Sequence, residues 1–386
     1  MGEQSGEFAL IDTFLRPFGL ARDGARGKDK ARQVVRGPGD DCAQVKVSKG
    51  HTLVATTDAI VEGVHFDRAL HPYPASTLRW ARAAGHKALA VNLSDLAAAG
   101  AKPLGFLCAL GVPKTDDAER IARVLAEGMA PLARQQCPLV GGNVTKSPVW
   151  SLTITALGEA KAPLTRAGGK PGDALVLVGR VGGPALGLKL LREKSPKVMA
   201  GGGREAPIDA GAGVPEVTFE DDDGRESGDK SNETLAVDAL LTPRPLAHIG
   251  QLAAKAGPAR AHAAIDVSDG LLQDLTHLLR ASRCDAVVEL QSIPLHYALE
   301  SLVEGALVDT PDALAYALTG GEDYALLLAM PAAHAEKFVQ KLAKMGEIAA
   351  VIGKLMKPSP QGPRVQLTSH GAPVAPALPP GFDHLR

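Results

Sequence analysis

The chain has 386 residues, of which 45% are hydrophobic and 22% charged, and its formal net charge is −1. This balance gives no electrostatic basis for binding nucleic acid or a membrane surface. The N-terminal residues MGEQSGEFAL lack the apolar core of a signal peptide, and no apolar run is long enough to span a bilayer. The four cysteines, Cys42, Cys108, Cys137 and Cys284, form no CxxC pair. We therefore expect a cytoplasmic protein with reduced thiols rather than a disulfide scaffold or a zinc site.

Helical and alternating patterns follow one another through the first 160 residues, which we expect to form an N-terminal domain. The predicted elements are a helix over 7–18, strands over 43–47 and 52–57, a helix over 74–99, a strand over 104–112, a helix over 116–136, and strands over 138–141 and 150–157.

Residues 161–386 are expected to form a second domain, because a turn and an apolar strand at 165–179 begin a new series of elements. Mixed helices and strands in both parts predict a two-domain α+β fold. The acidic, glycine-rich segment 195–232 has few large apolar side chains, so we expect a disordered insertion. The other predicted elements are helices over 184–192, 245–255, 271–282 and 332–345, and strands over 262–266, 286–290, 324–330 and 348–352.

Aspartates recur in apolar or glycine-rich settings that are far apart in the sequence: GPGDDCA, TTDAIVEGVHF, NLSDLAAAGA and AIDVSDG. Carboxylates in such settings are costly unless a positive charge meets them. Mg²⁺ is the usual partner, since it takes oxygen ligands and often bridges to phosphate. No GxxxxGK[ST] motif is present. The pattern predicts a magnesium-dependent nucleotide enzyme that lacks a P-loop.

The first two motifs leave alternatives open. In GPGDDCA one aspartate could bind metal while the other caps a turn, or the motif is simply an Asp-rich turn. Asp58 follows a short apolar strand, and Thr56 and Thr57 can add oxygen ligands to the same cation. His65 is either a structural histidine or a contact to a phosphate or a substrate ring.

The remaining motifs place polar groups on a helix and at turns. Asp95 lies on an alanine-rich helix, where it either faces a metal or lies exposed on the polar side. GGNVTKSP reads as a glycine-rich turn whose N–H groups approach phosphates. Asp266, Ser268 and Asp269 converge at a predicted helix N-terminus, and LTGGEDY forms a second glycine turn.

In this order, GDDCA, TTDAIVEGVHF, KALAVNLSDLAAAGAKP, GGNVT, LTRAGGKPGD, AIDVSDGLLQDL and TGGEDYALL closely resemble the thiamine-monophosphate kinase family, over about residues 7 to 352. The resemblance implies ATP-dependent phosphorylation of thiamine monophosphate to thiamine diphosphate by in-line transfer, the last step of thiamine diphosphate biosynthesis. It also implies several Mg²⁺ ions, a C-terminal α/β sandwich, and a homodimer in which the N-terminal mixed sheets form a barrel.

The resemblance further implies roles for single residues, with no protein nucleophile, because the attacking phosphate oxygen is already an anion. Contacts to ATP fall on Gly142, Asn143, Arg166 and Ser268, and contacts to thiamine monophosphate on His65 and Glu322. The implied metal ligands are Asp41, Thr56, Thr57, Asp58, Asp95, Asn143, Asp266 and Asp269.

Two departures from the family pattern are visible. Asn143 stands where the family usually has Asp, and no Trp precedes Gly381, so Phe382 is the remaining aromatic candidate near the C-terminus. Selenophosphate synthetase and a hydrogenase maturation factor belong to the same superfamily. The first would need a reactive cysteine in a context unlike that of Cys42, and the second a C-terminal cysteine where this chain has Arg386. A non-catalytic nucleotide- or metal-binding regulator is the alternative from another class.

The homodimer is expected to form through N-terminal strands, including 52–57 and 104–112, because a free sheet edge invites pairing with a second copy. The strand at 104–112 carries almost no charge. Burial of that strand inside one subunit is the alternative explanation.

Overall fold

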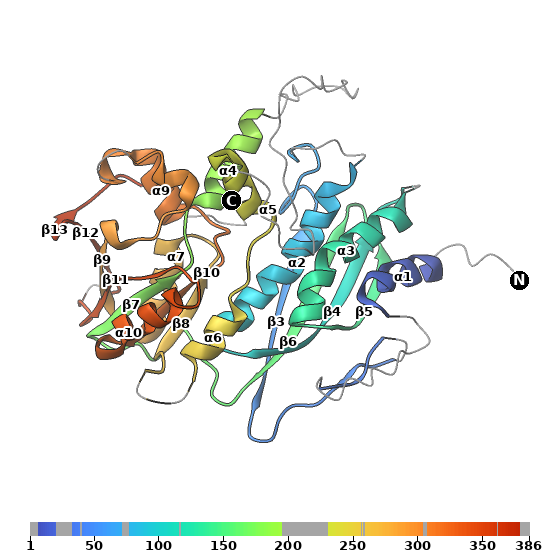
Figure 1. Ribbon diagram of the computed structural model, residues 1–386, viewed down its shortest axis with the longest axis horizontal. Coiled ribbons are helices and arrows are strands. Elements are labelled where there is room, and N and C mark those ends of the chain that lie inside the picture. The colour runs from blue at the N-terminus through green and yellow to red at the C-terminus, as the bar shows by residue number, and fades with distance from the viewer. Residues whose placement is uncertain are drawn as a thin grey trace, which may run out of the picture.

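Two β-sheets with the long helix α2 (Arg79–Ala98) between them organise the molecule, and each half of the chain supplies one sheet (Figure 1). The computed structural model describes residues 7–20, 33–38, 41–71, 77–115, 117–194, 231–255, 257, 259–303, 307–360 and 362–378. Within these residues, no helix is long and apolar enough to cross a membrane.

The N-terminal half contains a four-stranded sheet in the order β3-β6-β4-β5, in which only the β4–β5 pair is parallel. Helices α2 and α3 pack on one face, where alternate residues of β6, such as Leu152 and Ile154, are fully buried. On the opposite face Leu53 is 52% exposed. The elements are β3 (Thr52–Val61), β4 (Lys102–Val112), α3 (Ala118–Gln135), β5 (Leu139–Lys146) and β6 (Ser151–Ala160).

Two glycines let α2 and α3 cross at close range. A Cβ atom at Gly85 would lie 1.9 Å from the carbonyl oxygen of Leu125, and one at Gly128 would lie 2.0 Å from that of Arg82. Each helix therefore presents a glycine to the backbone of the other, and any side chain there would force the helices apart. This contact fixes the position of α2, which carries several of the site residues described below.

The C-terminal half contains a seven-stranded sheet in the order β13-β12-β9-β11-β7-β10-β8, in which only β12–β9 is parallel. Alternate residues of β7 enter two clusters, one shared with α7 and α9 and the other with α6 and α10. Both faces are thus covered, which explains the continuous apolar run DALVLV. The elements are α6 (Ala247–Ala253), β7 (Asp173–Val178), β8 (Ala263–Val267), α7 (Leu271–Ser282), β9 (Asp285–Glu289), α9 (Pro311–Thr319), β10 (Ala325–Pro331), α10 (Ala332–Ala343), β11 (Ala349–Met356), β12 (Val365–Ser369) and β13 (Ala372–Val374).

Shorter elements connect or flank the sheets. Ser231 caps helix α5 by accepting a hydrogen bond from the backbone N–H of Thr234 at 3.3 Å. The others are α1 (Glu7–Leu15), β1 (Val34–Arg36), β2 (Gln44–Val45), α4 (Gly183–Lys194), α5 (Asn232–Leu241), α8 (Tyr297–Glu300) and 3₁₀ helices at Arg16–Phe18, Leu290–Ser292 and Leu307–Asp309.

The predicted α+β fold is confirmed, with three local corrections. Residues 141–146 belong to strand β5 and do not form a turn. Asp58 lies inside β3, which continues to Val61, and not at its end. The strand at 104–112 is not a sheet edge, because β4 lies between β6 and β5. The expected insertion lies outside the described residues except for its last two, Ser231 and Asn232, which begin α5.

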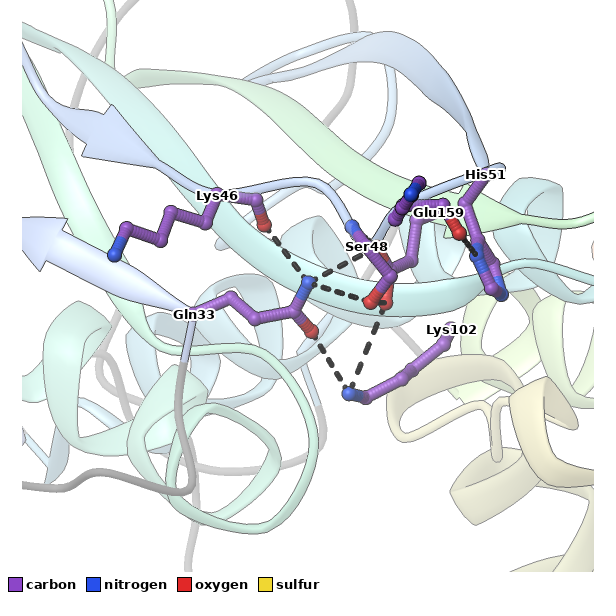
Figure 2. A network of polar contacts seen from close by, with 7 residues as sticks. Gln33, Lys46, Ser48, His51, Lys102 and Glu159 are labelled. Atoms are coloured by element: carbon purple, nitrogen blue, oxygen red, sulfur yellow. Dashed lines mark hydrogen bonds and ion pairs between the residues drawn. The ribbon is translucent and has the colours of Figure 1, made fainter.

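A buried carboxylate at the end of β6, that of Glu159, binds Gln33 and Ser48 (Figure 2). Glu159 is 4% exposed and accepts hydrogen bonds from the backbone N–H of Ser48 at 2.6 Å and from Nε2 of Gln33 at 2.9 Å. Lys102 donates to Oε1 of Gln33 at 2.9 Å and lies 3.9 Å from Glu159. The two ends of the segment from 33 to 48 are therefore fixed to the four-stranded sheet.

Candidate active site

Both halves of the chain line one cavity of about 630 Å³. The N-terminal half contributes β3, the turn that follows it, and one face of α2. The C-terminal half contributes Arg166, α4, α5, the loop between β8 and α7, and the turn before β10. The site residues that line it are Asp58, His65, Asp95, Arg166, Asp266, Ser268, Asp269 and Glu322.

Two carboxylates reach the cavity from regular elements of the N-terminal half. Thr56 and Asp58 lie two residues apart on β3, so their side chains share the face that α2 covers. The hydroxyl of Thr56 donates to Oδ2 of Asp95 at 2.5 Å, which joins the strand to the helix. Asp95 is half-buried and lines the cavity, so it does not lie exposed on a polar face of the helix.

The carboxylate of Asp266 enters from β8 and meets the same helix. Its side chain is 6% exposed, and its Oδ2 accepts a hydrogen bond from the hydroxyl of Ser94 at 2.8 Å. Burial raises the pKa of Asp266 to about 7, and the nearby carboxylate of Asp95 pushes it in the same direction. A cation close to both groups would relieve this repulsion.

A buried acid accepts hydrogen bonds from the backbone of the loop that carries Ser268 and Asp269. Oδ2 of Asp274, on the first turn of α7, accepts the backbone N–H groups of Ser268 at 2.9 Å and of Asp269 at 3.0 Å. Burial raises the pKa of Asp274 to about 6, although these hydrogen bonds oppose the rise. Gly270 has φ of +116°, a conformation that only glycine adopts readily. Asp274 lies within the motif AIDVSDGLLQDL but was given no role there, although its place in the first helical turn is a recognisable signal.

A strained turn supplies Glu322. Its φ is 70° and that of Tyr324 is 48°, both unusual for residues other than glycine. The turn is held against the neighbouring loop, because the N–H of Glu322 donates to the carbonyl oxygen of Ser268 at 2.6 Å. On the cavity side, Nζ of Lys87 donates to Oε1 of Glu322 at 2.6 Å.

Lys87 was not among the residues predicted from the sequence. It lies on α2, and helical spacing offered a signal, because positions 87, 91 and 95 follow one another at intervals of four along the lining face. Its partner is 235 residues away in the chain, however, so no local pattern could have revealed the pair.

Five predicted site residues do not line this cavity. One is Thr56, whose hydroxyl instead holds the carboxylate of Asp95. Thr57 lies on the other side of β3, where its hydroxyl donates to the carbonyl oxygen of Ile154 at 3.0 Å. Gly142 and Asn143 are in β5, three strands from β3, or about 14 Å at the usual strand spacing. Asp41 is exposed in the anchored segment between β1 and β2. Phe382 lies outside the described residues.

The donor set of the cavity suits a hard cation. Four of its aspartates, Asp58, Asp95, Asp266 and Asp269, are predicted site residues and offer carboxylate oxygens, the ligands that Mg²⁺ prefers. Within the described ranges, however, no three Asp, Glu, His or Cys side chains are grouped closely enough to hold a metal ion by themselves. A cation here would therefore need further oxygen ligands, such as those of a bound phosphate.

Comparison with known proteins gives consistent matches along the chain. Residues 39–160 match the N-terminal domain of AIR synthase related proteins, and residues 170–360 match their C-terminal domain. A thiamine-monophosphate kinase of Haemophilus influenzae is 31% identical over 384 residues, covering 99% of this chain and 98% of the relative. The crystal structure of thiamine-monophosphate kinase from Stenotrophomonas maltophilia is similar with a TM-score of 0.69 and 29% identity, covering 96% of this chain and 98% of that one. AaThiL complexed with AMPPCP and TMP shares the fold, with a TM-score of 0.62 and 23% identity, covering 99% and 97% of the two chains.

Proposed function

The chain belongs to the thiamine-monophosphate kinase family, and from this premise we propose that it transfers the γ-phosphate of ATP to thiamine monophosphate. The products are thiamine diphosphate and ADP. The observation that carries the proposal is a cavity to which both halves of the chain contribute carboxylates, together with Arg166 and Ser268. AaThiL, which has the same fold, binds AMPPCP and TMP together.

The reaction needs positioning and charge neutralisation more than a protein nucleophile. A phosphate oxygen of thiamine monophosphate attacks the γ-phosphorus of ATP, the bond from that phosphorus to the bridging oxygen breaks, and ADP leaves with the electron pair. The attacking oxygen is ionised at neutral pH, so no general base is required. The cavity residues act by aligning two anions that would otherwise repel each other.

Four aspartates of the cavity lining are proposed to hold Mg²⁺ together with the phosphates. Asp58 and Asp95 would act from the N-terminal half, and Asp266 and Asp269 from the C-terminal half. Bound Mg²⁺ supplies positive charge that offsets the charge of the phosphate oxygens. Thr56 orients Asp95 through its hydroxyl. Family resemblance alone adds Asp41, Thr57 and Asn143 to the proposed ligands.

The organic substrates are assigned to different parts of the site. Arg166 and Ser268 are proposed to contact ATP phosphates, through a guanidinium group and through a loop next to the N-terminus of α7. His65 and Glu322 are proposed to contact thiamine monophosphate, with the carboxylate facing the cationic thiazolium ring. Gly142 is proposed as an ATP contact on family resemblance.

A homodimer is proposed through the uncovered face of the four-stranded sheet. Leu53 is exposed there, and Thr57 and Asn143 lie on the same face by strand alternation. Two such faces packed together would bury apolar surface and bring these polar positions into the interface. The domains are proposed to be residues 1–160 and 161–386.

Turnover tests this function directly. The purified chain with Mg²⁺, ATP and thiamine monophosphate should yield thiamine diphosphate and ADP in equal amounts, separated by chromatography. Omitting Mg²⁺ should abolish the reaction, and thiamine should not replace its monophosphate. Binding of both substrates without product would support the regulator alternative. Light scattering should give about twice the 40.0 kDa of one chain, and a mass of one chain would contradict the dimer.

A further inference from the structure

Lys87 is the most deeply buried permanent cation in the cavity lining, and the family resemblance stated above assigns it no role. Its exposure is 4%, whereas Arg166 and Arg192, the other permanent cations of the lining, are exposed. A buried ammonium group is unfavourable without a partner. The partner in this structure is a single carboxylate from the other half of the chain.

That partner is Glu322, and the contact joins three segments around one end of the cavity. Nζ of Lys87 donates to Oε1 of Glu322 at 2.6 Å and lies 3.5 Å from the carbonyl oxygen of His65. Lys87 belongs to α2, His65 to the turn after β3, and Glu322 to the turn before β10. The ammonium group therefore links the two residues that are proposed to contact thiamine monophosphate.

The backbone of Glu322 is fixed, but its side chain needs a second restraint. Its N–H is bonded to the carbonyl oxygen of Ser268, yet three rotatable bonds separate the carboxylate from the backbone. The side chain is 31% exposed, so water would compete for the carboxylate if Lys87 were absent. The ion pair restricts this freedom and keeps the carboxylate at the cavity wall.

We propose that Lys87 is a positioning residue for thiamine monophosphate, because it holds the carboxylate of Glu322 where the thiazolium ring of the substrate will lie. Lys87 occupies Oε1, and Oε2 is left for the ring cation. The inference rests on the proposed function. Lys87 acts through Glu322 and does not contact the substrate.

The first test is Lys87→Met, which keeps the length of the side chain and removes its charge. KM for thiamine monophosphate should rise about tenfold, while KM for ATP and kcat stay within about threefold, because the ATP side of the cavity is untouched. Lys87→Arg should recover most of the loss. An unchanged KM for thiamine monophosphate, or an equal fall in all parameters, would overturn the proposal.

A double variant distinguishes positioning from direct contact. If Lys87 acts through Glu322, then Lys87→Met combined with Glu322→Gln should bind thiamine monophosphate no more weakly than Glu322→Gln alone, as measured by calorimetry without ATP. Additive losses would mean that Lys87 meets the substrate itself, which contradicts the proposal.

Arg244→Met is the matched control. Arg244 pairs with Glu347 at 3.0 and 2.5 Å, joins two distant segments in the same way, and does not line the cavity. This variant should lose a comparable amount of stability but keep both KM values. If the wild-type chain itself forms no thiamine diphosphate, the proposed function fails. If the wild type is active and the Lys87 variants match the control, only the role of Lys87 fails.

Discussion

Asp58 and Asp95 project from the interior of a strand and a helix, whereas Asp269 and Glu322, at the same cavity, lie in loops of the C-terminal half. In the N-terminal half the regular hydrogen bonding of the element positions the carboxylate. In the C-terminal half the loop is positioned by other side chains, of which Asp274 and Lys87 are the clearest. Cavity carboxylates on regular elements, Asp266 on β8 included, are therefore positioned by the backbone, whereas those in the loops of the C-terminal half depend on supporting side chains.

Buried acids accompany the loops of the C-terminal half. Burial raises the pKa of Asp274 to about 6 and that of Asp323 well above its usual range. Each accepts backbone N–H groups, in the case of Asp323 that of Gly182 at 2.8 Å. Burying these acids costs free energy, yet they hold the turns that face the cavity. Substitutions of residues that support the site should therefore lower activity and stability more in this half than in the other.

The largest expected effect is the loss of one cavity carboxylate from either half. Asp95→Asn and Asp269→Asn should each lower kcat/KM by about 100-fold or more, because a lost ligand charge weakens the holding of Mg²⁺ at the phosphates. Higher Mg²⁺ should restore part of the activity. Steady-state kinetics over a magnesium series measures both effects.

Asp312→Asn is the control for these variants, since Asp312 forms an exposed pair with Lys189 and does not line the cavity. Its kinetics should match the wild type. Near-normal turnover of either cavity variant at low Mg²⁺ would remove that aspartate from the proposed ligands.

A smaller effect is expected from replacing Asp274, which supports the loop between β8 and α7. Asp274→Ala leaves the N–H groups of Ser268 and Asp269 without their acceptor, which should cost about 1–3 kcal/mol of unfolding free energy and lower kcat/KM about tenfold. Asp274→Asn keeps one acceptor oxygen and should lose less of both. Urea unfolding and kinetics on the same samples provide the measurement. Full activity in the alanine variant would show that the loop holds its shape without Asp274.

The positions of helices and strands were predicted well from the sequence where the pattern was local. Strand 262–266 and helix 271–282 lie within one residue of β8 and α7, because an apolar run is followed by a short polar turn that ends in glycine and then by an amphipathic helix. Helix α5 was missed since it directly follows a polar segment, and α9, β12 and β13 were also not predicted.

The error at GGNVT has a physical reason. Two adjacent glycines usually indicate a turn, but a Cβ atom at Gly142 would lie 2.0 Å from the carbonyl oxygen of Cys108. Glycine is required there for the close approach of β5 to β4. The pairing of Lys87 with Glu322 left no sequence signal, because the two residues are 235 positions apart and nothing local to either one indicates its partner.

The smallest expected effect concerns Glu159, the buried acid of the N-terminal half. Its pKa is lowered, whereas that of Asp274 is raised. Burial alone would raise the pKa of Glu159, but hydrogen bonds from Ser48 and Gln33 and the charge of Lys102 outweigh it, so its pKa lies below the usual value of 4.5. A carboxyl group with a lowered folded pKa stabilises the fold above about pH 4.5 and loses that contribution as the pH falls further.

Glu159→Gln should therefore lower the unfolding free energy by about 1 kcal/mol at pH 7, and the difference from wild type should shrink below pH 4.5. Urea unfolding at pH 7 and pH 4 measures it, with Glu336→Gln, an exposed glutamate on α10, as the control. A difference that is equal at both pH values would mean that the charge of Glu159 plays no part. In that case the anchoring of the segment from 33 to 48 would rest on packing and neutral hydrogen bonds, and the contrast between the acids of the two halves would reduce to burial alone.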